Sequence, residues 1–262
     1  MRFGICAPPE HTTEIAAAGF AYVEWPLRSI AALCDREYAE LRKVSDSLAV
    51  RAEAFNVMLP GTIKVTGPDA DLQGMQQYLE GAFGRAAELG GSVVVFGSGS
   101  SRTVPEGWAH SQATEQFTEA CAIAGAVAAR HQLTIVIEPL NPAETNLVTT
   151  VREAVGVAER VAHPSVRVLS DLYHVDTGGE PFEDTTFAGA LLAHVHVATP
   201  EDRSIPLPGR GGDSLEGYFR ALLAAGYDGR VSVEGTWSPD QLAEGAAHLR
   251  ETWAWVSDNG GV

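Results

Sequence analysis

Short runs of β-branched and other apolar residues recur eight times along this 262-residue chain, and longer Ala-rich amphipathic segments separate them. This alternation is typical of repeated strand–helix units around a parallel sheet, because each helix covers the sheet while it returns the chain to the start of the next strand. The expected strands are FGIC (3–6), YVEW (22–25), AEAFNV (52–57), VVVFG (93–97), TIVIEPL (134–140), VRVLSD (166–171), HVHVA (194–198) and VSVEG (231–235).

The segments between these runs have the pattern of surface helices. In DLQGMQQYLEGAFGRAAELG, SQATEQFTEACAIAGAVAARH and SLEGYFRALLAAG, apolar residues recur at spacings of three and four. Eight such units predict an α/β fold, a parallel eight-stranded (β/α)8 TIM barrel, as a single domain over residues 1–262. The competing fold is an open doubly wound sheet, which normally has a Gly-rich turn after its first strand. GICAPPEH is not such a turn, so the barrel is favoured.

Composition limits the partners and the compartment. The formal net charge is −16, and the 18 Lys and Arg residues do not supply the basic footprint that nucleic acid requires. No apolar run approaches the roughly 20 residues that span a bilayer, and the first residues lack a secretory pattern. We therefore expect a cytoplasmic protein that binds neither nucleic acid nor membrane. Cys6, Cys34 and Cys121 are odd in number and far apart, which argues against disulfides and thiolate zinc sites.

The last four predicted strands each end with a side chain that can bind a metal. A carboxylate or imidazole in a strand buried on both faces needs a partner or a cation to offset its desolvation. The carboxyl ends of barrel strands converge on one face, so residues far apart in sequence can surround one point. These residues are Glu138 in IVIEPLN, Asp171 in VLSDLYH, His196 in HVHVAT and Glu234 in VSVEGT. They predict a site for one divalent metal ion at the mouth of the barrel.

Three carboxylates and one imidazole form a ligand set dominated by oxygen. Such a set suits Mn²⁺, Mg²⁺ or Co²⁺ better than an ion that prefers thiolates, and Mn²⁺ is our first expectation. His194 shares a strand face with His196 because side chains two residues apart point the same way, so a different register would make His194 the ligand. We favour His196, since His194 lies deeper in the strand, where packing or support of a ligand is expected.

Longer motifs around these residues resemble a known family. IEPLNPAETN, SDLYHVD, HVHVATPEDRSIPLPGRGGDS and GYDGRVSVEG together resemble the xylose isomerase-like TIM barrels, and within them the ketose 3-epimerases and the relatives of hydroxypyruvate isomerase. The N-terminal strands look like those of sugar phosphate isomerase/epimerase relatives. The resemblance implies the barrel fold, a divalent metal and chemistry on a small carbohydrate.

The resemblance also implies roles for the four metal-site residues. In the epimerases that the chain resembles, the glutamates matching Glu138 and Glu234 bind the metal and transfer a proton on opposite faces of the substrate. The residues matching Asp171 and His196 complete the metal shell. We therefore expect Glu138 and Glu234 to be the catalytic pair.

Further positions match residues that contact substrate in the family. Glu144 is the second glutamate of EPLNPAETN, and His174 follows Asp171 in a loop over the barrel mouth. Arg203 matches an arginine after the strand that carries His196, but the loop VATPEDR is longer than the family pattern. Arg203 and Arg210 are therefore rival candidates for that contact.

These inferences predict a metal-dependent sugar isomerase or epimerase, of the ketose 3-epimerase type. A cation bound to a ketone oxygen and the neighbouring hydroxyl would stabilise a cis-enediolate once a carboxylate has removed the proton next to the carbonyl. Return of a proton by the second carboxylate inverts the centre, whereas return to the adjacent carbon interconverts aldose and ketose. The substrate would be a small carbohydrate, and a homo-oligomer stays open.

Two other functions stay open. A lyase of the same superfamily, acting on a keto-inositol or a 3-keto glycoside, would begin with the same proton abstraction and then expel a substituent. A non-catalytic sugar-binding or partner subunit would have little use for an intact ligand set. Arg102, near GSGSSR, and Arg210, in PGRGG, are candidates for holding a phosphate if the substrate carries one.

Overall fold

The strands of the chain form a closed parallel barrel in sequence order. The computed structural model describes residues 1–211 and 213–260. Each strand pairs with the next, and the first pairs with the last. The strands are β1 Arg2–Cys6, β2 Tyr22–Pro26, β3 Ala52–Asn56, β4 Val93–Phe96, β5 Thr134–Ile137, β6 Val166–Asp171, β7 Leu192–Val197 and β8 Arg230–Val233. Every predicted run overlaps one of these strands, so the predicted (β/α)8 barrel is confirmed and the open sheet is wrong.

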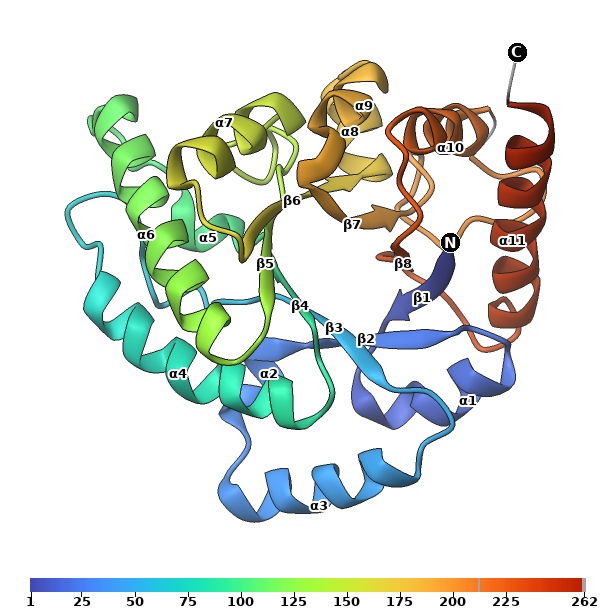
Figure 1. The fold of residues 1–262 in the computed structure, drawn as a ribbon, viewed down its shortest axis with the longest axis horizontal. Helices are drawn as coiled ribbons and strands as arrows, with labels where there is room; N and C mark the ends of the chain where they lie inside the picture. The colour runs from blue at the N-terminus through green and yellow to red at the C-terminus, as the bar shows by residue number, and fades with distance from the viewer. Residues whose placement is uncertain (212, 261–262) are drawn as a thin grey trace.

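Helices surround the ring of strands, as Figure 1 shows. Their apolar faces pack on the outer face of the sheet and form one large core there. The helices are η1 Pro9–His11, α1 Thr12–Ala17, α2 Leu27–Ala32, α3 Asp35–Ser47, α4 Leu72–Glu88, α5 Gly99–Arg102, α6 His110–Arg130, α7 Val151–Val161, α8 Leu172–Gly178, α9 Glu183–Ala188, η2 Gly189–Leu191, α10 Ser214–Ala224 and α11 Leu242–Asn259. None of the described helices is both long and apolar enough to cross a membrane.

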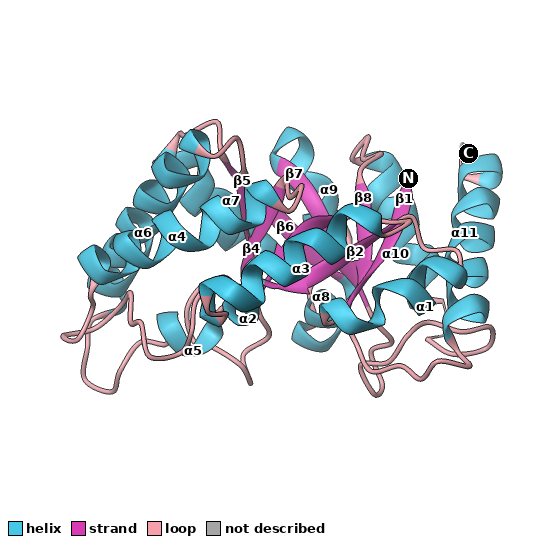
Figure 2. Cartoon of the chain, turned by 90° about the horizontal axis from the view of Figure 1, so that it is seen from below, coloured by secondary structure: helices cyan, strands magenta, loops and turns pink. Residues whose placement is uncertain are grey.

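One end of the barrel carries the loops that follow the strands. The short helices α5 and α8 lie there, after β4 and β6, and Figure 2 shows them at the opposite end from the N-terminus. Helix α8 begins directly after Asp171, whose side chain accepts a hydrogen bond from the N–H of Tyr173 and so caps the helix. The last residue of β6 therefore both ends a strand and starts a helix at this face.

The interior of the barrel has an apolar side and a polar side. The apolar side is a small cluster formed by Tyr22, Ala54, Val93, Val95, Val136 and Leu169. The polar side consists of buried residues of β2, β7 and β8, which are Glu24, His194, His196 and Ser232. Gly4 on β1 lies under the ring of Tyr22, where a Cβ atom would overlap the ring. Hydrogen bonds therefore hold the polar side of the interior, and apolar packing holds the other side.

Candidate metal centre

The structure brings together the four residues that the sequence analysis selected as metal ligands. One ligand atom from each of Glu138, Asp171, His196 and Glu234 lies within 4.8 Å of the others. Asp171 ends β6 and His196 is near the end of β7, while Glu138 and Glu234 directly follow β5 and β8. Four successive strands therefore deliver one ligand each to the same point of the barrel mouth, and this group can hold a divalent cation. Their roles as ligands stay predictions.

His196, and not His194, faces this group. Its Nδ1 atom is 3.2 Å from Oε1 of Glu138 and 3.6 Å from Oε2 of Glu234. His194 lies deeper in the barrel, where its Nε2 atom is 2.8 Å from Oε2 of Glu24. The register of β7 therefore places the imidazole of His196 in the position that a metal ligand requires.

Asp171 supplies the observation that fits this group to a cation. Its side chain is fully buried, and Oδ1 accepts a hydrogen bond of 2.8 Å from the N–H of Tyr173. Oδ2 is buried and has no hydrogen-bond partner among the described residues. Burial raises the pKa of Asp171 to about 8. An ionised carboxylate is costly in such a place without a compensating charge, and a divalent cation shared with Glu138 and Glu234 would supply it.

The two glutamates differ in their proton affinity. Burial, and then the charge of Glu234, raise the pKa of Glu138. Burial also opposes ionisation of Glu234, but His196 and Arg203 outweigh it and lower the pKa of Glu234 to about 2. Arg203 donates to Oε2 of Glu234 at 2.8 Å, and the side-chain amide of Asn56, at the end of β3, donates to Oε1 at 3.0 Å. Glu234 is therefore held as an anion by its own neighbours.

All three residues predicted to contact substrate lie beside the metal group: Glu144, His174 and Arg203. Arg203 donates to Oε1 of Glu144 at 3.0 Å. His174 is buried in α8, so our expectation of a loop position is wrong; the cap at Asp171 starts a helix there. Burial and the charge of Arg203 lower the pKa of His174 to about 3.

Two contacts of Asn141 with Nδ1 place the proton of the neutral His174 ring on Nε2, and they outweigh the longer contact of 3.5 Å between Nη2 of Arg203 and Nε2. The backbone N–H and the side-chain amide of Asn141 are 3.2 and 3.0 Å from Nδ1, which must accept from the backbone N–H. Nε2 lies 3.8 Å from Oδ2 of Asp171, the oxygen that has no partner among the described residues. His174 thus presents a hydrogen-bond donor toward the metal group.

Of the two rival arginines, Arg203 is the one at the site. Arg210 has a side chain that is 52% exposed and lies 3.9 Å from Oδ2 of Asp202, away from the metal group. Arg203 adopts a left-handed backbone conformation, with φ of 50°, and its carbonyl accepts a hydrogen bond of 2.8 Å from the N–H of Thr236. Gly235 permits this contact, because a Cβ atom at position 235 would lie 2.5 Å from that carbonyl oxygen. The loop of Arg203 is thereby fixed to the end of β8.

Arg102 has a structural position, and the prediction that it could hold a phosphate is wrong. Its guanidinium is fully buried, and it donates to the carbonyls of Phe96 at 3.0 Å, Glu138 at 2.7 Å and Val148 at 3.4 Å. Burial lowers its pKa to about 10, so it is charged at neutral pH. Arg102 therefore ties the end of β4 to the backbone of Glu138 and leaves its charge beneath the metal group.

Glu24 is the buried carboxylate that the sequence analysis missed. It is fully buried in β2 and lies 3.0 Å from Nε2 of His196 through Oε1. A charged residue in the middle of the run YVEW was a usable signal, because such a residue inside a parallel barrel needs a partner. Glu24 lies inside β2, whereas the predicted metal-site residues lie at or directly after the ends of their strands.

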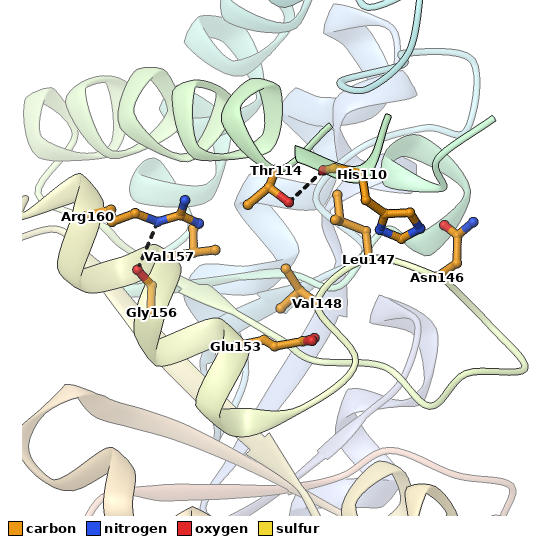
Figure 3. A pocket seen from close by; sticks show the side chains of 9 residues that line it. All are labelled: His110, Thr114, Asn146, Leu147, Val148, Glu153, Gly156, Val157 and Arg160. Carbon is orange, nitrogen blue, oxygen red and sulfur yellow. Dashed lines mark hydrogen bonds between the residues drawn. The ribbon is translucent and has the colours of Figure 1, made fainter. Parts of the chain in front are cut away.

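A separate pocket lies between α6 and α7, away from the barrel mouth. Figure 3 shows two of its polar side chains bonded to their own helices: Thr114 donates to the carbonyl of His110, and Arg160 donates to that of Gly156. Its lining residues are His110, Thr114, Asn146, Leu147, Val148, Glu153, Gly156, Val157 and Arg160. With a single carboxylate, this pocket does not offer the chemistry of the metal group.

Gly97, directly after β4, leaves the space that Glu138 occupies. A Cβ atom at position 97 would overlap Oε2 of Glu138. We expect Gly97→Ala to displace that carboxylate and weaken Mn²⁺ binding by roughly tenfold or more, measured by isothermal titration calorimetry. Gly81→Ala in α4 is the control, because nothing lies within 4 Å of the added atom. Equal Mn²⁺ affinity in Gly97→Ala and the unmodified protein would contradict this placement of Glu138.

Arg102 should contribute to folding stability through its bonds to carbonyl groups. Arg102→Leu leaves buried acceptors without a donor, and we expect the free energy of unfolding to fall by about 3 kcal/mol. The exposed Arg36 in α3 provides the control, since Arg36→Leu should change it by about 0.5 kcal/mol or less. Urea unfolding followed by circular dichroism measures both. A variant of Arg102 as stable as the unmodified protein would show that these bonds do not hold the strand ends.

Known proteins share this fold and parts of this sequence. A 3-dehydro-D-guloside 4-epimerase of Escherichia coli (strain K12) is 29% identical over 136 residues, which are 50% of this chain and 48% of that protein. A ketose 3-epimerase of Arthrobacter globiformis is 26% identical over 122 residues, 46% of this chain and 41% of that protein. The chain thus spans less than half the length of these curated relatives.

The solved structures and the family model cover far more of the chain. The structure of D-psicose 3-epimerase with D-tagatose from Clostridium cellulolyticum H10 superimposes with a TM-score of 0.83 at 19% identity, over 97% of this chain and 99% of that one. Residues 13–252 match the family model described as xylose isomerase-like TIM barrel, which confirms the resemblance seen in the sequence. The chain belongs to the family of xylose isomerase-like TIM barrels.

Proposed function

We propose that this chain is a divalent-metal-dependent epimerase of the ketose 3-epimerase type, which moves a proton next to the carbonyl of a small keto sugar. The observation that carries the proposal is the group of three carboxylates and one imidazole at the barrel mouth. Within it, a buried Asp171 oxygen has no partner among the described residues. Buried carboxylates cost free energy unless a cation compensates their charge. The glutamates beside such a cation can accept a proton from a substrate.

The proposed metal ligands are Glu138, Asp171, His196 and Glu234. Oxygen ligands predominate, which favours Mn²⁺ as the ion and keeps Mg²⁺ and Co²⁺ as alternatives. When bound, the cation would polarise the carbonyl of the substrate and compensate the charge that develops on it. The same positive charge would keep the carboxylates ionised at neutral pH.

Glu138 and Glu234 are the proposed pair that removes and returns the proton. They follow β5 and β8, which are separated by β6 and β7 in the barrel, so they approach the group from different sides. Arg203 and Asn56 donate to Glu234 and fix its direction. One glutamate would take the proton next to the carbonyl, and the other would deliver a proton from its own side, which inverts the carbon.

Glu144, His174 and Arg203 are the proposed substrate contacts. The protonated Nε2 of His174 can donate to a sugar oxygen, and Glu144 can accept from a hydroxyl while Arg203 holds it in place. Fixing several substrate oxygens at once would orient the reacting carbon between the two glutamates.

The printed names of the relatives support epimerase activity over the lyase alternative. The two curated relatives are a 3-dehydro-D-guloside 4-epimerase and a ketose 3-epimerase, so both names denote inversion of a carbon next to a carbonyl. Each aligned segment covers only part of the relative. The class of reaction is therefore the proposal, and the sugar is left to experiment.

Proton exchange tests this function directly. The EDTA-treated protein is incubated in deuterated water, with and without Mn²⁺, with free ketoses, keto-inositol and 3-keto glucosides, and the products are followed by NMR. We expect metal-dependent deuterium incorporation next to the carbonyl together with an inverted centre. Loss of water or aglycone would replace the epimerase with a lyase, and absence of any exchange over the whole panel would contradict proton transfer on these sugars.

Replacement of one proposed proton-transfer residue gives a sharper prediction. Glu234→Gln removes the carboxylate but keeps the shape, so we expect turnover to fall by roughly 10²- to 10⁴-fold with the fold retained by circular dichroism. Glu201→Gln, in the exposed loop after β7, is the matched control and should keep its turnover. Full activity in the Glu234 variant would exclude Glu234 from the proton transfer.

A further inference from the structure

Glu24 on β2 makes an unusually complete set of contacts for a buried carboxylate. Its Oε1 atom lies 3.0 Å from Nε2 of His196. Its Oε2 atom lies 2.8 Å from Nε2 of His194 and accepts a hydrogen bond of 2.6 Å from the hydroxyl of Ser232. All four side chains are fully buried. Glu24 therefore reaches from β2 across the barrel interior to β7 and β8.

The hydroxyl of Tyr22 completes this network on the side away from the metal group. Because Ser232 donates to Glu24, the hydroxyl of Tyr22 donates to Oγ of Ser232, at 2.8 Å. Tyr22 is also fully buried, and its ring lies against Gly4. The carboxylate of Glu24 can only accept hydrogen bonds, and His194, His196 and Ser232 each direct a donor at it. These three contacts fix its position and rotation.

The contacts of Glu24 determine which nitrogen of His196 faces the metal group. Nε2 of His196 points to Glu24 and can bond to the carboxylate only by donating its proton. When the ring becomes neutral to bind a metal, Nδ1 is the nitrogen that loses its proton. Nδ1 is the atom that lies 3.2 Å from Glu138 and 3.6 Å from Glu234. A metal ligand needs this free lone pair.

We propose that Glu24 is a positioning residue of the metal centre, which holds His196 in the tautomer and orientation that direct Nδ1 at the cation. This inference rests on the proposed function, since it requires a metal at Glu138, Asp171, His196 and Glu234. The negative charge of Glu24 behind the ring also makes Nδ1 a better donor of its lone pair. Glu24 itself would not touch the metal or the substrate.

A second group of possible ligands gives the competing explanation. Atoms of Cys6, Glu24 and His196 also lie within 4.8 Å of one another, so Glu24 could be a direct ligand in a site with a thiol. The hydrogen bonds from His194 and Ser232 to Oε2, and the contact of Oε1 with His196, occupy the carboxylate. We therefore favour the positioning role, and the experiment separates the two.

Mn²⁺ titration of Glu24→Gln by isothermal titration calorimetry is the test. Glutamine has one carbonyl oxygen, and its NH₂ group would face either His196 or the other two donors. Where it faces His196, it favours the tautomer with the proton on Nδ1, which blocks metal binding. We expect the Mn²⁺ affinity to fall by roughly 10- to 100-fold.

Two variants serve as controls. Tyr22→Phe removes only the far hydroxyl of the network and should leave the Mn²⁺ affinity near that of the unmodified protein. Cys6→Ser should do the same if Glu24 acts through His196. Unchanged affinity in Glu24→Gln would show a purely structural Glu24, and a parallel loss in Cys6→Ser and Glu24→Gln would show a direct ligand; either result would overturn the proposal.

The proton that Glu24 holds on His196 can be measured without any variant. In the ¹⁵N-labelled, metal-free protein, imidazole NMR should report a proton on Nε2 of His196, whether or not Glu24→Gln folds. The absence of a proton on Nε2 would overturn the proposal. If the unmodified protein shows this proton but does not bind Mn²⁺, the proposed metal-dependent function fails and the contact between Glu24 and His196 stands.

Discussion

The burial of negative charge at one end of a closed barrel is the constraint on which this structure depends. Glu24, Glu138 and Asp171 are buried and Glu234 is mostly so, and the barrel brings them close together. Water cannot stabilise these carboxylates, so protein groups and a cation must do so. Two histidines on β7, Arg203 and a divalent ion would together supply that compensation. The same balance leaves two glutamates able to exchange protons with a substrate.

The residues that support these carboxylates lie around them according to the strands and loops that carry them. β7 carries the imidazole of His196 between a carboxylate inside the barrel and the carboxylates at its mouth. Arg102 holds the backbone of Glu138 from outside the sheet, and Gly97 leaves room for its side chain. Arg203 contacts the mouth from the opposite side, on a loop fixed to β8. Strand ends, or a loop fixed to one, therefore position each of these residues. A site that binds a metal and orients a sugar requires such rigid support.

The sequence predicted two features correctly: the strands, from the periodicity of apolar residues, and the grouping of the metal-site residues, from their places at strand ends. The strands, their order and the convergence of Glu138, Asp171, His196 and Glu234 followed from the alternation of apolar runs and from the geometry of a parallel barrel. The network around Glu24 could not be predicted in the same way, because contacts across the interior depend on which residues of distant strands lie at the same level. For the same reason, the loop phosphate contact expected of Arg102 was wrong: its side chain folds inward to carbonyls that are neighbours only in space.

The direct test of this account is a crystal of the protein grown with Mn²⁺, with diffraction data collected on both sides of the manganese absorption edge. The account predicts one anomalous peak at the barrel mouth, bonded to Glu138, Asp171, Glu234 and Nδ1 of His196. A peak bonded instead to Cys6, Glu24 and Nε2 of His196, or no peak in the barrel, would contradict it.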